Sequence, residues 1–203
     1  LQGGHSGADI HLGRVNGNRL MGRVLAAALE KFPGLRLAAI SGGQFDNVIC
    51  SRCDAAVAIP SGKEAAFEAF IAEFDATLKN EYAGCDDGIT LTCGKADVTA
   101  AISEVTTNLM LHTLLALPQG VQAMNVDFPG LVQTSLNLGV MTACSDGLHF
   151  SFSIRSSVAT QKELLLQRVR AIVEYTGGGT VSTRGDYPAW QYARQSRSEE
   201  HTS

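Results

Sequence analysis

The chain has 203 residues, of which 45% are hydrophobic and 18% are charged, and its formal net charge is −4. This is an ordinary globular composition, and the length is sufficient to bury a substantial core. The 16 Lys plus Arg and 20 Asp plus Glu are spread along the sequence and form no basic stripe, so we expect no nucleic acid partner.

Hydropathy and cysteine usage bear on the compartment. No apolar run approaches the roughly 20 residues that a membrane-spanning helix requires, so we expect no membrane association. The five cysteines are an odd number without the spacing of a disulfide framework, which favours reduced thiols. Together these features predict a cytoplasmic protein.

The elements expected in chain order combine helices with short strands. Apolar residues from Leu20 to Leu29 follow helical spacing and Pro33 ends the run, which predicts an amphipathic helix from Asn16 onward. The same reasoning predicts helices over residues 61–78, 98–117 and 161–175, and strands over residues 35–40, 55–59, 89–92, 121–126, 131–144, 148–154 and 180–184. The Asp146-Gly147 pair predicts a tight antiparallel hairpin between two of these strands.

This order of elements predicts an α+β fold, with antiparallel sheet and helices packed on one face, built of two α/β units. Both ends of the sequence suggest a piece of a longer protein. The opening Leu1-Gln2-Gly3-Gly4 begins where a strand should already be turning, so we expect the N-terminal strand to be missing. Residues 197–203 are polar and aperiodic and are expected to be a non-native tail.

Three short clusters could carry chemistry. His5, Asp9 and His11 include normal zinc ligands, but no second cluster completes a ligand set, so polar contacts within a loop are the favoured interpretation for Asp9 and His11. Cys50 and Cys53 form a lone C-x-x-C that leads directly into a strand, where a redox motif is not expected.

The third cluster is the triple glycine at 177–179. It follows a helix and precedes a predicted strand, which is the reverse of the order that directs backbone amides at a phosphate. We therefore expect it to end the helix and form a turn.

A longer set of residues resembles one family. The sequence GGHSG at residues 3–7 continues into D-I-H, G-R and N-G-N-R-L, and it is followed by N-V-I at 47–49, TSLNLGV at 134–140, I-R-S at 154–156 and G-D-Y-P-A-W at 185–190. This ordered set resembles the aminoacyl-histidine dipeptidases, also called peptidase D or cytosol non-specific dipeptidases. They belong to the di-zinc metallopeptidases.

The resemblance places the chain within the family's lid and dimerisation domain. It implies that residues 1–184 form this domain and that residues 185–196 begin the return to a catalytic domain. The two zinc ions, their ligands and the general base lie outside the lid in that family. The resemblance therefore implies a fragment of a cytosolic zinc-dependent dipeptidase that is inactive alone and forms a homodimer through the lid.

The resemblance also implies roles for individual residues. His5 matches the histidine that stabilises the oxyanion formed when a dipeptide is hydrolysed, reaching the site of the partner subunit. Asn47 matches a polar contact to the substrate, and Arg155 matches the group that pairs with the terminal carboxylate of the dipeptide. The alternative is a stand-alone α+β module that binds a protein or a small molecule without catalysis. A metal site at His5, Asp9 and His11 is a third possibility.

Overall fold

The computed structural model describes residues 1–144, 147–176 and 178–185. A five-stranded antiparallel sheet has β4 (Cys53–Ala58), β2 (Arg36–Gly42), β6 (Val132–Cys144) and β5 (Gly120–Met124) in that order, and β7 (Gly147–Ser156) also pairs with β6. A second, two-stranded sheet joins β1 (Gly4–His5) to β3 (Val48–Ile49). The predicted α+β class is confirmed.

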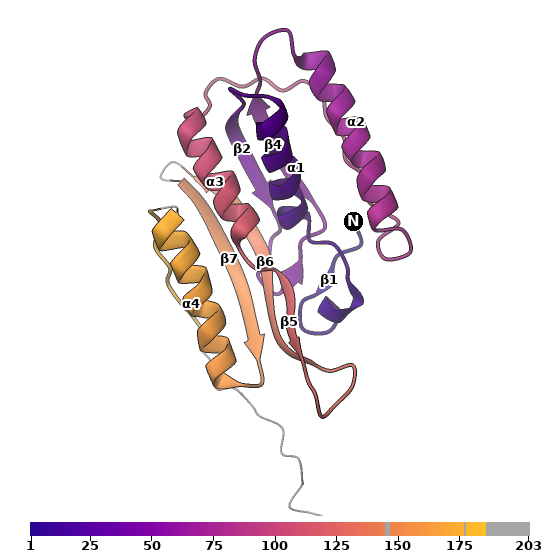
Figure 1. Ribbon diagram of the computed structural model, residues 1–203, viewed down its shortest axis with the longest axis vertical. Helices are drawn as coiled ribbons and strands as arrows, with labels where there is room; N and C mark the ends of the chain where they lie inside the picture. Colours follow the sequence, from indigo (N-terminus) through magenta and orange to yellow (C-terminus); the bar gives the residue numbers. More distant parts are fainter. Residues whose placement is uncertain (145–146, 177, 186–203) are drawn as a thin grey trace, which may run out of the picture.

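Four helices accompany the sheet. They are α1 (Gly17–Lys31), α2 (Glu64–Glu81), α3 (Glu104–Ala116) and α4 (Ala159–Thr176), and a short 3-10 helix, η1, covers Ile10–Leu12. Helices α1, α3 and α4 lie on one face of the sheet, and α2 packs beside α1 (Figure 1). The ring of Phe32, at the end of α1, meets Phe67 and Phe70 of α2 at centroid distances of 5.3 and 5.7 Å.

Strand β6 connects the two halves of the domain, because it pairs with β7 along most of its length and with two different strands on its other edge. Near its start it pairs with β5, from Leu136 opposite Gly120, and near its end it pairs with β2, where Met141 is opposite Gly42. The predicted pair of α/β units therefore shares one continuous hairpin.

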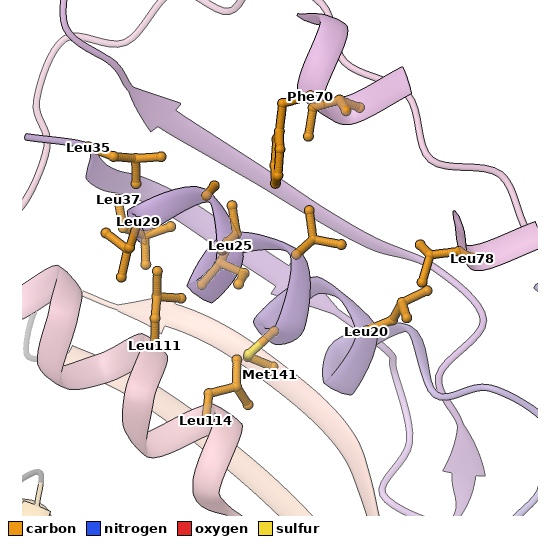
Figure 2. Packing of buried hydrophobic residues seen from close by; sticks show 14 of the residues in the cluster. Leu20, Leu25, Leu29, Leu35, Leu37, Phe70, Leu78, Leu111, Leu114 and Met141 are labelled. Atoms are coloured by element: carbon orange, nitrogen blue, oxygen red, sulfur yellow. The ribbon is translucent and has the colours of Figure 1, made fainter. Parts of the chain in front are cut away.

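Two hydrophobic cores follow this division. The larger core joins α1, α2, α3 and β2 to the end of β6, and Leu35, Leu78, Leu111, Leu114 and Met141 are fully buried in it (Figure 2). The smaller core lies under α4 and consists of the buried residues Leu117, Leu136, Leu165 and Val169, with Phe150, Phe152 and Ile154 of β7 packed against them.

Three predicted elements differ from the structure. The strand predicted over residues 89–92 is wrong, because the backbone N–H of Leu91 donates to the carboxylate of Asp75 at 2.7 Å instead of to a neighbouring strand. The helix predicted from Val98 begins at Glu104, where the hydroxyl of Ser103 caps it by accepting from Thr106 N.

The strand predicted over residues 180–184 is also absent from the described part of the chain. There the Arg184 guanidinium donates to Asp46 Oδ2 and to Ser151 Oγ, both at 3.1 Å, so side-chain contacts hold this segment. Residues 145–146 of the predicted hairpin turn and residues 186–203 lie outside the described residues, although Cys144 pairs with Gly147 as a tight hairpin requires.

Candidate functional site

The loop that carries His5 is joined to the loop that carries Asn47 by the small sheet of β1 and β3. In this sheet His5 is opposite Val48 and Gly4 is opposite Ile49. The backbone N–H of Ser6 also donates to the carbonyl of Asn47 at 2.9 Å. Two predicted site residues that are 42 positions apart are therefore neighbours.

The imidazole of His5 is exposed, and its orientation is fixed through Nδ1. The backbone N–H groups of Gly7 and Ala8 both donate to His5 Nδ1 at 3.2 Å. Because a backbone N–H can only donate, Nδ1 is the acceptor nitrogen, and the proton of the neutral ring is on Nε2. The site therefore presents an N–H donor to whatever approaches Nε2.

The backbone on the N-terminal side of His5 is held by an ion pair. Asp9 Oδ2 accepts from the backbone N–H of His5 at 2.8 Å and lies 3.3 Å from Arg14 Nη1, which donates to Gly3 O at 2.8 Å. An alanine Cβ at Gly4, where φ is +147°, would lie 2.5 Å from the Arg14 guanidinium and 2.6 Å from Asp9 Oδ2. Only glycine fits there, which gives the paired glycines before His5 a physical reason.

The loop around Asn47 is positioned by a buried side chain of β6. Asn137 is fully buried, and its amide donates to the carbonyls of Asp46 and Val48, both at 2.8 Å. The Oδ1 atom of Asn137 accepts from Asn16 Nδ2 at 3.1 Å, and Asn16 caps the start of α1. One buried amide network therefore joins the Asn47 loop to the helix that follows the His5 loop.

A close backbone approach supports the same loop. An alanine Cβ at Gly139 would overlap Asp46 Cα and would lie 2.5 Å from the carbonyl oxygens of Asp46 and Phe45. Such a separation cannot be relieved by rotating a side chain, so Gly139 is needed where the register between β6 and β7 shifts. Asn137 and Gly139 both belong to the TSLNLGV segment. Their function in the fold is to hold the loop at 46–48.

Arg155 reaches the His5 loop from the other unit of the fold. It lies on β7 opposite Ser135 and is exposed. An alanine Cβ at Gly7 would lie 2.9 Å from Arg155 Nη1 and 3.0 Å from His5 Cε1, so both side chains meet at this glycine. Gly7, Asn47 and Arg155 also line one open groove.

The structure therefore brings the three predicted residues together, and it adds supporting residues that the sequence reasoning did not identify. Alternate residues of β7 pack into the cores, which places Ser151, Ser153 and Arg155 on the opposite, polar face of the sheet. Within the described part of the chain, no carboxylate lies within ion-pair distance of Arg155.

The other candidate clusters have structural functions. Burial raises the pKa of the Cys50 and Cys53 thiols, which disfavours the reactive thiolate, and Cys50 Sγ donates to Arg52 O at 3.0 Å. At the end of α4, Gly178 has φ +60° and the N–H of Gly179 donates to Val173 O at 3.2 Å, which is the expected helix C-cap.

A metal ion does not fit the residues described. Among residues 1–144, 147–176 and 178–185, no group of three or more His, Cys, Asp or Glu side chains could hold one. At the proposed trio of His5, Asp9 and His11, the Asp9 carboxylate instead binds Arg14 and the backbone of His5.

No helix in the described residues is both long and apolar enough to cross a membrane.

Comparisons with known proteins agree with this arrangement. Residues 1–85 match the family described as the peptidase dimerisation domain. The chain is 31% identical over 192 residues to the cytosol non-specific dipeptidase of Escherichia coli (strain K12), which covers 94% of the chain and 39% of that protein. It superposes on the crystal structure of aminoacylhistidine dipeptidase from Vibrio alginolyticus with a TM-score of 0.92 and 29% identity, over 98% of the chain and 41% of that structure.

Proposed function

Residues 1–85 match a peptidase dimerisation domain and almost the whole chain is similar to part of two dipeptidases, and from this premise we propose that the chain is the lid of a cytoplasmic dipeptidase of the aminoacyl-histidine type. The chain spans about two fifths of the length of the relatives it matches. We assign residues 1–184 to the lid and dimerisation domain and residues from 185 onward to the return toward a catalytic domain. The substrate of the complete enzyme is an Xaa-His dipeptide or a broader range of dipeptides.

His5 is the residue that stabilises the transition state. Attack of a hydrolytic nucleophile on a peptide carbonyl places negative charge on the carbonyl oxygen, and a fixed hydrogen-bond donor aimed at that oxygen lowers the barrier. The observation that carries this role is the pair of N–H groups of Gly7 and Ala8 donating to His5 Nδ1, because they leave Nε2–H as the donor. They also hold the ring in one orientation, so the donor needs no reorganisation during the reaction.

Arg155 and Asn47 bind the substrate. A guanidinium offers two parallel N–H donors to a carboxylate, and Arg155 projects from the polar face of the sheet next to Gly7. It therefore pairs with the terminal carboxylate of the dipeptide, and Asn47 makes a further polar contact. These contacts are equally strong before and during the reaction, so they contribute to binding of the substrate.

The remaining requirements lie outside the described residues. The described residues contain no group of three or more metal-ligating side chains, and the two zinc ions implied by the family are assigned to the catalytic domain. The lid also forms the homodimer, in which His5 reaches the active site of the partner subunit. The fragment alone is therefore inactive.

The test is steady-state hydrolysis of Ala-His by the full-length enzyme with added zinc, comparing wild type, His5→Ala and Arg155→Ala. His5→Ala should lower kcat by about 10²- to 10³-fold, the usual effect of removing one oxyanion donor, without changing the zinc content. Arg155→Ala should mainly raise KM, because the lost contact binds substrate and transition state alike.

His11→Ala is the matched control, since it removes a second exposed imidazole from the same loop. It should leave both kcat and KM unchanged. A wild-type kcat in His5→Ala would show that His5 is structural and that the lid only covers the active site. Absence of dipeptide hydrolysis in the wild-type protein would instead favour a stand-alone binding module.

A further inference from the structure

The loop that presents His5 has little regular structure to hold it. Between the start of the chain and α1 it contains only the two residues of β1 and the single turn of η1. A catalytic donor nevertheless requires accurate placement, because an error of about 1 Å can lower the rate about 10²-fold. The contacts that fix both ends of this loop therefore matter to the chemistry.

One buried carboxylate, that of Asp86, contacts both ends of the loop. Asp86 lies in the turn after α2 and is 1% exposed. Its Oδ1 and Oδ2 atoms accept from the backbone N–H of Gln2 at 3.2 and 3.3 Å, and Oδ2 also accepts from the N–H of Val15 at 3.4 Å. Gln2 precedes the glycine pair before His5, and Val15 directly precedes the cap of α1.

The neighbouring residue strengthens the attachment. Cys85 Sγ donates to the carbonyl of Gly13 at 3.0 Å, so the turn after α2 contacts the loop at a third point. The turn is itself tied to α2, because the N–H groups of Cys85 and Asp86 both donate to Tyr82 O at 3.0 Å. The His5 loop is thereby fixed to a helix that packs against the larger core.

We propose that Asp86 is a positioning residue that sets the location of His5 by holding Gln2 and Val15 on one carboxylate. This proposal rests on the proposed function of His5. An ionised carboxylate has only acceptor atoms, so it can serve both N–H groups, and its charge strengthens each bond. Asp86 touches neither the substrate nor the reacting atoms and acts only through His5.

The substitution Asp86→Asn tests this function with little change in side-chain size. It removes the charge and replaces one acceptor oxygen with an NH2 group, which cannot accept from a backbone N–H. In the full-length enzyme it should lower kcat by about 10- to 100-fold and leave KM near the wild-type value. The loop of Asn47 keeps its two hydrogen bonds from Asn137, and Arg155 keeps its place on β7, in this variant. If Asp86→Asn does not fold, Asp86→Glu replaces it, since the extra methylene displaces the same oxygens.

A double-mutant cycle with His5→Ala separates positioning from general destabilisation. If Asp86 acts through His5, Asp86→Asn lowers kcat in the wild-type background and has no further effect in the His5→Ala background. Equal effects in both backgrounds, or no effect in either, would overturn the proposal. A wild-type kcat in His5→Ala alone would instead show that the proposed function of His5 has failed, and with it the positioning claim.

Asp87→Asn is the matched control for the same chemical change at the adjacent position. The carboxylate of Asp87 accepts from Gly84 N at 2.7 Å within its own turn and is exposed. This variant should retain the wild-type kcat. A fall equal to that of Asp86→Asn would attribute the effect to the turn as a whole and would contradict the specific function of Asp86.

Discussion

The larger core and the smaller core hold the candidate site in different ways. His5 and Asn47 lie on loops that are attached to elements of the larger core by buried polar contacts, including those of Asn137 and Asp86. Arg155 lies on β7, next to Ile154, which packs on the four buried residues of the smaller core. The group proposed to act in the transition state is thus on the more extensively supported side of the molecule.

This difference matches what each function demands. A hydrogen bond to a developing oxyanion depends on a fixed geometry, whereas a long guanidinium side chain can adjust to a carboxylate. Weakening the larger core should therefore impair kcat before substrate binding is lost. Weakening the smaller core should affect mainly the binding of the substrate.

The largest expected effect compares one leucine from each core. Leu114 is fully buried in the larger core and packs closely on α1, since an alanine Cβ at Gly22 would lie 2.7 Å from its side chain. We expect Leu114→Ala to lower the free energy of unfolding by about 4 kcal/mol and Leu165→Ala, in the smaller core, by about 2 kcal/mol, as measured by urea denaturation. Equal losses would contradict the distinction between the two cores.

A smaller effect is expected where the two halves meet at Gly139. The substitution Gly139→Ala brings a Cβ against the backbone of Asp46, and we expect a loss of about 1–3 kcal/mol in the free energy of unfolding. Gly94→Ala is the control, because nothing lies within 4 Å of a Cβ at Gly94 and its φ is not in the left-handed region. A Gly139→Ala variant as stable as Gly94→Ala would show that the close approach is not required.

The smallest expected effect concerns acid stability near the larger core. Two hydrogen bonds lower the pKa of Asp75 below its ordinary value. The larger effect comes from the bond donated by Lys79 and the smaller one from the bond donated by Leu91 N. Its stabilising contribution is therefore present above the ordinary pKa of an unfolded Asp and is lost as the pH falls through the lower folded value.

Thermal melts at about pH 6 and about pH 3 would measure this contribution. Asp75→Asn should have the lower Tm at the higher pH, and the difference from wild type should shrink in acid. If the difference in Tm between Asp75→Asn and the wild type is the same at both pH values, the effect of the substitution comes from packing and not from the charge of Asp75. The shift should be small because Lys79 is half exposed.

The sequence predicted most of the secondary structure because helical periodicity and turn residues are local signals. It failed at residues 89–92, where Ile89 is buried without pairing to a strand and the backbone N–H of Leu91 donates to Asp75. It also placed the start of α3 too early, because Val98 and Ile102 are apolar but precede the Ser103 cap.

The site was only partly predictable for a related reason. His5, Asn47 and Arg155 were selected by resemblance to a family, and their roles stay predictions. The residues that support them could not be found from local patterns, because Asp86 acts on Gln2 across 84 positions and Asn137 acts on Asp46 across 91. Only the folded chain brings these groups together.

The measurement that tests the central claim most directly is inhibition of the full-length enzyme by a phosphinic dipeptide analogue that mimics the tetrahedral intermediate. If His5 donates to the oxyanion, His5→Ala should weaken binding of the analogue by the same factor by which it lowers kcat/KM, about 10²- to 10³-fold, while binding of the product is unchanged. An inhibition constant equal to that of the wild type would contradict the claim.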